Sequence, residues 1–154
     1  MTQSSKGQGR IEAHAKVSWS GWGGEVEGGS GVLKAHTATQ VELGGPGNAT
    51  KPEELLAAAL ANCYTSTITA YARSRKIELE HVETRARTRL AWDETTPHHI
   101  AEGVLSVRIC SPAPEDALRA LAQDAREHCP ICNVLSATAK VTLSVSIQPS
   151  AARS

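Results

Sequence analysis

The strongest constraint on the fold is a long segment, Pro52 to Arg75, that is predicted to form one α-helix. Small or apolar side chains lie on nearly every side of it, including Leu55, Leu60 and Ile68. Pro52 and the acidic residues after it suit a first helical turn, where a missing N–H is tolerated and the helix dipole favours negative charge. Because a helix that is apolar all round has to be buried, we expect it to lie at a homodimer interface.

The remaining elements come in blocks of strands and blocks of helices, an order typical of an α+β fold rather than a parallel βαβ fold. Residues 1–9 are predicted to be a disordered polar tail, and residues 10–148 a single domain. The glycine-dense segment 21–31 is predicted to be a turn and mobile loop. The predicted strands are 10–19, 32–43, 77–92, 99–110 and 139–148, and two further helices are predicted over 112–128 and from 129.

Charge and hydropathy exclude several functions. The chain has 16 basic and 16 acidic residues and no net charge, so nothing favours nucleic acid, which is bound through clustered Lys and Arg. Arg85, Arg87 and Arg89 alternate along one predicted strand, and we interpret that face as solvated. No apolar run approaches the roughly 20 residues that span a bilayer. The first ten residues lack the apolar region of a secretory signal, so we expect a cytoplasmic protein that binds no membrane.

Two of the four cysteines lie within or at the start of predicted helices. Cys63 lies in the middle of the long helix, and Cys129 stands directly before Pro130, where a helix is expected to begin. The thiol of Cys129 would lie at the positive end of the helix dipole, which favours the thiolate. Burial in apolar surroundings disfavours the thiolate of Cys63, so a cation from another element is needed to activate it. This arrangement indicates a redox pair.

The segment CPIC, from Cys129 to Cys132, allows other interpretations. A thioredoxin-like motif needs a strand directly before it, whereas here a predicted helix precedes it. A structural zinc site needs four ligands, usually in two such pairs, and the sequence has one. Cys132 either fills the core or takes part in thiol chemistry. No cofactor and no metal are expected.

The long segment PEELLAAALANCYTSTITAYAR and the later segment HCPICNVLSAT together resemble the OsmC/Ohr family, that is, osmotically inducible protein C and the organic hydroperoxide resistance proteins. The resemblance follows the order of elements over nearly the whole chain. It implies an intertwined α+β homodimer in which antiparallel sheets are wrapped around long central helices. It also implies active sites at the dimer interface.

The same resemblance implies a thiol-dependent peroxidase that reduces organic hydroperoxides to alcohols in oxidative-stress defence. By position, Cys63 matches the peroxidatic cysteine and Cys129 the resolving cysteine, which implies a Cys63–Cys129 disulfide. Glu53 matches the acid that holds an activating arginine. A small dithiol or a dithiol protein is implied as the reductant.

The chain departs from the family pattern in two places. Residues 19–51 contain no arginine, so the activating cation is expected from a later strand, such as Arg87 or Arg89, or from the partner chain. Cys132 adds a second thiol to the later motif; either thiol could resolve, or Cys129 and Cys132 could form their own disulfide. The alternative function is a noncatalytic OsmC-like domain that binds a small apolar or thiol ligand at the dimer cleft.

Overall fold

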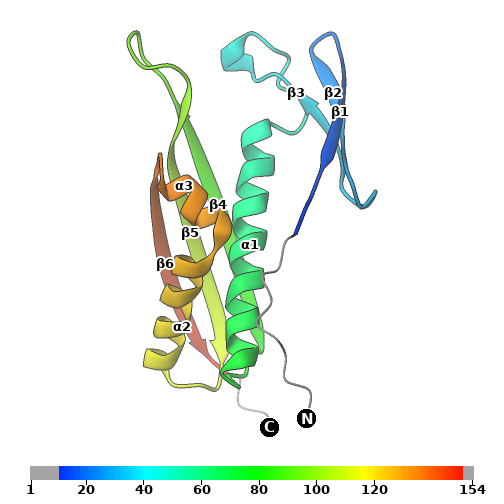
Figure 1. Cartoon of the computed structure of the whole chain (residues 1–154). Helices are drawn as coiled ribbons and strands as arrows, with labels where there is room; N and C mark the ends of the chain where they lie inside the picture. Colours follow the sequence, from blue (N-terminus) through cyan, green and yellow to red (C-terminus); the bar gives the residue numbers. More distant parts are fainter. Residues whose placement is uncertain (1–10, 151–154) are drawn as a thin grey trace. The chain divides into compact units, whose positions relative to one another are not determined.

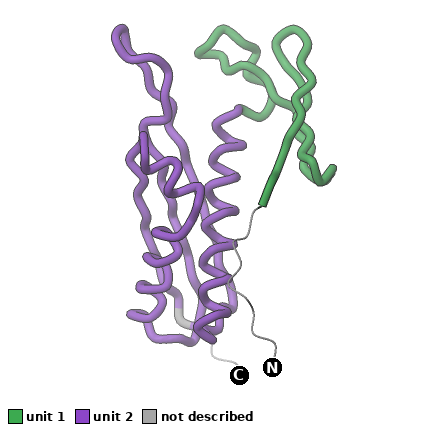
Figure 2. Tube along the Cα trace, in the orientation of Figure 1, with its two compact units in different colours: residues 1–51 green, residues 52–154 purple. Residues whose placement is uncertain are grey.

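The computed structural model describes residues 11–150, which fall into two compact units. Unit 1 ends at Lys51 and unit 2 begins at Pro52 (Figure 2). The predicted tail over residues 1–9 lies outside the described residues. The single domain over residues 10–148 stays a prediction, since each unit has a sheet of its own.

Unit 1 is a three-stranded antiparallel sheet in the order β1–β2–β3. The strands are β1 (Ala15–Ser20), β2 (Gly23–Gly28) and β3 (Lys34–Ala38). β1 and β2 pair along their full lengths, from Ala15 opposite Gly28 to Ser20 opposite Gly23. The turn between them contains Gly21 at φ 60°, a left-handed conformation that glycine adopts without a Cβ clash.

Two predictions in this unit were wrong in detail. The segment 21–31 is not a loop throughout, because β2 occupies most of it; buried Val26 between two exposed glutamates has the alternation of a strand. The predicted strand 32–43 stops at Ala38, and a short 3-10 helix, η1 (Val41–Leu43), follows.

Unit 2 begins with helix α1 (Pro52–Ser74), which confirms the long helix predicted from the sequence. The helix ends in a Schellman motif: the N–H of Ile77 donates to the carbonyl of Ala72 at 2.9 Å, and that of Lys76 to Arg73 at 3.2 Å. Lys76 takes the left-handed position of that motif, with φ 57°. Glycine usually occupies this position, so a lysine there carries some backbone strain.

Three strands form the sheet of unit 2, in the order β4 (His81–Ala91), β5 (His99–Ser111) and β6 (Lys140–Pro149). β4 and β5 are antiparallel, whereas β6 runs parallel to β5. The sheet is therefore mixed rather than purely antiparallel. The chain returns between β5 and β6 through helices α2 (Glu115–His128) and α3 (Pro130–Ser136). Strands and helices thus form an α+β arrangement, as expected.

The core of unit 2 lies between the three helices and one face of this sheet (Figure 1). On β5 that face carries Leu105, Val107 and Ile109, all nearly or fully buried. α1 contributes a stripe in steps of four residues, including Leu60, Tyr64 and Ile68. The rest of α1 is half-buried or exposed in the single chain. The all-round burial predicted for this helix is therefore not reached within one chain, and the homodimer stays a prediction.

The opposite face of the sheet is polar. Arg85, Arg87 and Arg89 are all exposed there, which confirms the interpretation of a solvated face. Glu83 forms ion pairs with Arg85 at 2.7 Å and with Arg108 on the neighbouring strand. No helix among the described residues is both long and apolar enough to cross a membrane.

Candidate active site

Cys63 lies in the middle of α1, one residue before the buried Tyr64. It is half-buried and packs against the core cluster of unit 2. Its place beside the buried stripe follows from helix periodicity, since Leu60, Tyr64 and Ile68 recur every four residues and face the core. The thiol therefore stands at the border between the core and the exposed side of the helix.

Cys129 joins α2 to α3. α2 ends at His128, and Cys129 takes an extended conformation with φ −74° and ψ 115°. It is the N-cap of α3, with Pro130 at the first helical position, as the sequence predicted. The Cys129 sulfur accepts the backbone N–H of Cys132 at 3.5 Å. Both cysteines are fully buried.

The structure brings Cys63, Cys129 and Cys132 together, and these three residues are called the thiol cluster below. The Cys129 side chain lies close enough to the thiols of Cys63 and Cys132 to raise the pKa of each. The middle sulfur of the cluster is therefore that of Cys129. All three cysteines are free thiols. The remaining cysteine, Cys110, lies on β5, where its thiol donates to Glu80 at 3.3 Å.

Burial governs the ionisation of the cluster. Burial raises the pKa of the Cys63 thiol above its ordinary value of 9.0, the backbone N–H of Ile131 lowers it, and the neighbouring Cys129 raises it again. Burial and the hydrogen bond to Cys129 raise the pKa of Cys132 to about 12, partly offset by the charge of Arg126. Cys63 and Cys132 are therefore neutral thiols in the reduced chain near pH 7.

Arg126 is a site residue that sequence reasoning missed. It stands in the last turn of α2, three residues before Cys129, and its guanidinium donates to the carbonyl of Val141 at 2.9 Å. This hydrogen bond holds a positive charge close enough to Cys132 to lower the pKa of that thiol. Helix periodicity gave no signal for it, because α2 ends at His128 and Cys132 belongs to the next helix, α3.

Arg87 and Arg89 do not supply charge to the thiol cluster from within the same chain. Thr84 and Thr88 mark the face of β4 that meets α1: Thr84 hydrogen-bonds Thr65 at 2.7 Å, and Thr88 donates to the Glu53 carbonyl at 2.9 Å. The arginines alternate with these threonines and therefore project from the other face of the sheet. This expectation from the sequence was wrong for the single chain.

Glu53 lies in the first turn of α1. Ten residues of continuous helix separate it from Cys63, which corresponds to about 15 Å along the axis. The structure therefore does not bring Glu53 into the thiol cluster, and the role that the resemblance implies for it stays a prediction.

A tyrosine fixes α1 beside the cluster. The hydroxyl of the fully buried Tyr64 donates to the carbonyl of Ala122 on α2 at 3.0 Å. Burial, followed by the charges of Cys132 and Cys129, raises the pKa of Tyr64 well above its ordinary value. Tyr64 is therefore a neutral hydrogen-bond donor that sets the position of Cys63 relative to α2.

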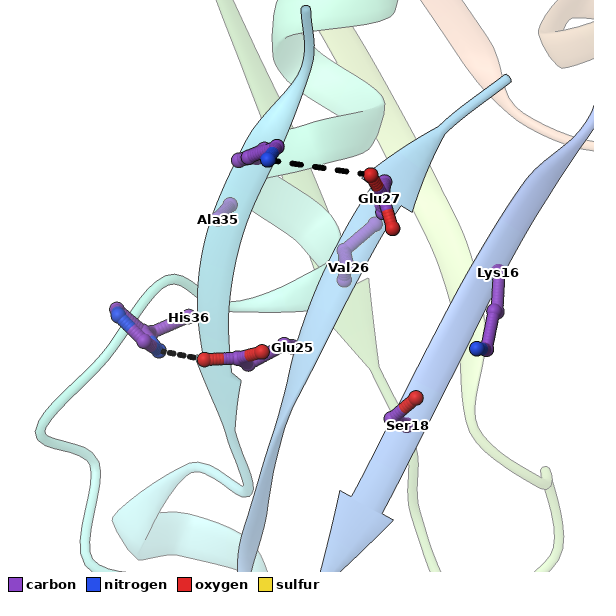
Figure 3. Close-up of a pocket in the computed structure, with 8 residues that line it drawn as sticks. Lys16, Ser18, Glu25, Val26, Glu27, Ala35 and His36 are labelled. Atoms are coloured by element: carbon purple, nitrogen blue, oxygen red, sulfur yellow. Dashed lines mark ion pairs between the residues drawn. The ribbon is translucent and has the colours of Figure 1, made fainter. Parts of the chain in front are cut away.

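Unit 1 has a hollow on its sheet. Its lining comes from all three strands and includes Lys16 on β1, Glu25 on β2 and His36 on β3 (Figure 3). His36 pairs with Glu25 at 3.7 Å, and Lys34 pairs with Glu27 at 3.9 Å. These are cross-strand pairs on an exposed sheet face, and no thiol lines the hollow. Within residues 11–150, no group of three or more His, Cys, Asp or Glu is placed to hold a metal ion.

Comparison with known proteins adds to this geometry. The family model described as OsmC-like protein matches residues 45–144. An organic hydroperoxide resistance protein OsmC from Legionella pneumophila is similar in structure, with 34% identity, a TM-score of 0.78, and coverage of 90% of this chain and 99% of that chain. No curated protein sequence gives a significant match.

Two further solved structures share the fold at lower identity. An organic hydroperoxide resistance protein from Elizabethkingia anophelis has 24% identity and a TM-score of 0.79, covering 92% of this chain and 99% of that one. The organic hydroperoxide resistance protein OhrB of Bacillus subtilis has 22% identity and a TM-score of 0.70, covering 88% and 98%. Since the family model spans most of the chain and both thiol motifs, the chain belongs to the OsmC-like protein family.

Proposed function

We propose that this protein is a cysteine-based peroxidase that reduces organic hydroperoxides to alcohols. The observation that carries the proposal is the proximity of the Cys63 and Cys129 thiols, close enough for Cys129 to raise the pKa of Cys63, in a chain of the OsmC-like family. Two neighbouring thiols, one half-buried and one fully buried, are suited to a peroxidatic and a resolving role. The name of the Legionella relative supports the same substrate class.

The proposed reaction has three steps. The Cys63 thiolate attacks the terminal peroxide oxygen; the O–O bond breaks, and the alkoxide takes a proton and leaves as the alcohol. Cys63 is then a sulfenic acid, which the Cys129 thiol attacks, so that a disulfide forms and water leaves. A small dithiol or a dithiol protein reduces this disulfide by thiol–disulfide exchange.

We further propose that the working unit is a cytoplasmic homodimer. The four cysteines form no disulfide within residues 11–150, which suits a reducing compartment. Trp19 and Trp22 are 50% and 61% exposed, and much of α1 is uncovered in the single chain. A second copy that covers these surfaces would also bring a cation to Cys63, whose pKa no basic residue among residues 11–150 lowers. In that assembly Glu53 would act as a positioning residue that orients the cation.

The test is consumption of cumene hydroperoxide in the presence of dithiothreitol. Cys63→Ser should abolish turnover, whereas Cys129→Ser should allow one reaction and then accumulate over-oxidised Cys63. Cys110→Ser is the matched control, because Cys110 contacts Glu80 outside the thiol cluster, and it should keep the wild-type rate. Peroxide consumption by Cys63→Ser at the wild-type rate would overturn the assignment.

The second candidate is a noncatalytic domain that binds a small apolar or thiol ligand. The observation that favours it is the raised pKa of Cys63 caused by burial, which leaves little thiolate at neutral pH. Wild-type protein that consumes no peroxide but binds a small thiol in calorimetry would support this function over the peroxidase.

A further inference from the structure

Cys132 is not used by the proposed reaction, although it belongs to the thiol cluster. It is fully buried, its backbone N–H donates to the Cys129 sulfur at 3.5 Å, and the neighbouring Cys129 thiol raises its pKa. The hydrogen bond therefore holds Cys132 against the sulfur that would form the disulfide with Cys63. A cysteine that only fills the core does not need this contact.

The local backbone also suits a bond between Cys129 and Cys132. Cys129 is the N-cap of α3, and Cys132 is its third helical residue, so their side chains lie on the same side of the first turn. The rise and rotation of an α-helix put Cα atoms three residues apart at about 5 Å, inside the range that a disulfide spans. The chain can form this bond without rearranging α3.

Resting on the proposed peroxidase function, we propose that Cys132 receives the disulfide in a third thiol step. The Cys132 sulfur attacks the Cys129 sulfur of the Cys63–Cys129 disulfide, and Cys63 leaves as a thiolate. A Cys129–Cys132 disulfide forms, and the proton of Cys132 passes to Cys63. The number of disulfides and of electrons is unchanged, and Cys63 becomes a reduced thiol again.

The charge of Arg126 favours the attacking form of Cys132. Burial is the largest cause of the raised pKa of Cys132, and the guanidinium of Arg126 opposes it. Because the thiolate is the form that attacks a disulfide, Arg126 assists the attack of Cys132 on the Cys129 sulfur.

The exchange also moves the disulfide inward. Cys63 is half-buried, whereas Cys129 and Cys132 are fully buried. Because exchange depends on access to the sulfur under attack, a bulky dithiol reaches the first disulfide through Cys63 but not the second. The oxidised chain therefore resists reduction more strongly when Cys132 is present.

Peptide mapping distinguishes the two disulfides. Trypsin releases Cys129 and Cys132 in one peptide, residues 127–140, and Cys63 in another, residues 35–73. After one equivalent of cumene hydroperoxide and alkylation, wild type should give peptide 127–140 two hydrogens lighter, with Cys63 alkylated. Cys132→Ser should give the two peptides cross-linked. A wild-type chain that keeps the cross-link with Cys132 alkylated at every time point would overturn the proposal.

Stoichiometry without reductant gives a second readout. Wild type should consume about two equivalents of peroxide per chain, because the freed Cys63 reacts again, and Cys132→Ser about one. Cys110→Ser should behave as wild type. Equal stoichiometry for wild type and Cys132→Ser would contradict the exchange.

A glutathione redox buffer separates failure of this inference from failure of the peroxidase function. Its thiol exchange needs no peroxide chemistry, so it should also yield the lighter peptide 127–140. If wild type consumes no peroxide but the buffer yields the lighter peptide 127–140, the peroxidase function is wrong and the Cys129–Cys132 pairing is supported. If peroxide is consumed and the cross-link persists in both experiments, the third thiol step alone is wrong.

Discussion

Removal of one hydroxyl tests how α1 is held beside the thiol cluster. Tyr64→Phe deletes the hydroxyl that donates to the Ala122 carbonyl at 3.0 Å, from a side chain that is fully buried. The ring stays, so no large cavity forms. The change therefore isolates one hydrogen bond between α1 and α2.

The expected loss of stability is about 1 kcal/mol, the usual net contribution of one intramolecular hydrogen bond. The larger penalty for an unsatisfied buried acceptor does not apply, because Ala122 lies inside α2 and its carbonyl keeps its bond within the helix. For a chain of this length, about 1 kcal/mol corresponds to a Tm lower by roughly 2–4 °C.

Tyr71→Phe is the matched control. Tyr71 lies on the same helix, and its ring is tilted against that of His128 with 5.2 Å between the ring centroids. Its hydroxyl makes no hydrogen bond to the described residues. Thermal and urea unfolding of the reduced proteins should show a loss for Tyr64→Phe and almost none for Tyr71→Phe. Equal stability of the two variants would refute the role of the Tyr64 hydrogen bond.

The same pair of variants has a pH signature. Burial raises the pKa of Tyr64 above its ordinary value of 10.0, so the folded state favours the neutral phenol. The stability that depends on the neutral phenol is complete below the ordinary pKa and is lost as the pH rises towards the higher pKa of the folded state. The difference between wild type and Tyr64→Phe should therefore be constant near neutral pH and shrink above about pH 10.

Three further predictions follow from the geometry. Iodoacetamide should alkylate Cys63 at a rate that still rises with pH through 9, since burial raises its pKa; a plateau near pH 5 or 6 would contradict this. Lys76→Gly should stabilise the chain by about 1 kcal/mol in urea unfolding, because it relieves the backbone strain of a non-glycine residue in the left-handed conformation. Ser74→Gly, within α1, should instead destabilise the chain. Leu60→Ala, at a fully buried position, should cost about 2–5 kcal/mol, while Val134→Ala, 68% exposed, should change stability by less than about 0.5 kcal/mol.

The helices could be predicted from the sequence because their signals are local. α1 was expected over 52–75 and spans Pro52–Ser74, since a proline, acidic residues and an apolar pattern mark its start and course. β2 was missed because its glycines suggest a turn. The structure gives another reason for one of them: a Cβ on Gly24 would meet the Ser18 carbonyl and the Trp19 ring. A contact between strands, not a turn, requires glycine there.

Pairings between distant segments could not be predicted from local pattern. The final strand was expected, but its parallel pairing with β5 depends on the path of α2 and α3 across the sheet. Cys63 and Cys129 lie 66 positions apart; their predicted elements suggested a redox pair, but the disulfide between them was suggested only by family resemblance. The alternation predicted a solvated face with Arg87 and Arg89, but the contacts of Thr84 and Thr88 with α1 were needed to show that this face points away from the thiol cluster.

The first turn of α3 supplies part of the electrostatic stabilisation that an arginine would give to the Cys63 thiolate. Pro130 has no N–H, so the first free donors of this helix are the N–H groups of Ile131 and Cys132. The backbone N–H of Ile131 lowers the pKa of Cys63, while that of Cys132 donates to the Cys129 sulfur. Both thiols of the proposed pair thus lie beside consecutive backbone donors of a single turn. A shift of α3 relative to α1 would therefore change the contact between the sulfurs and the ionisation of Cys63 together, and no side-chain substitution in the turn short of proline removes these donors.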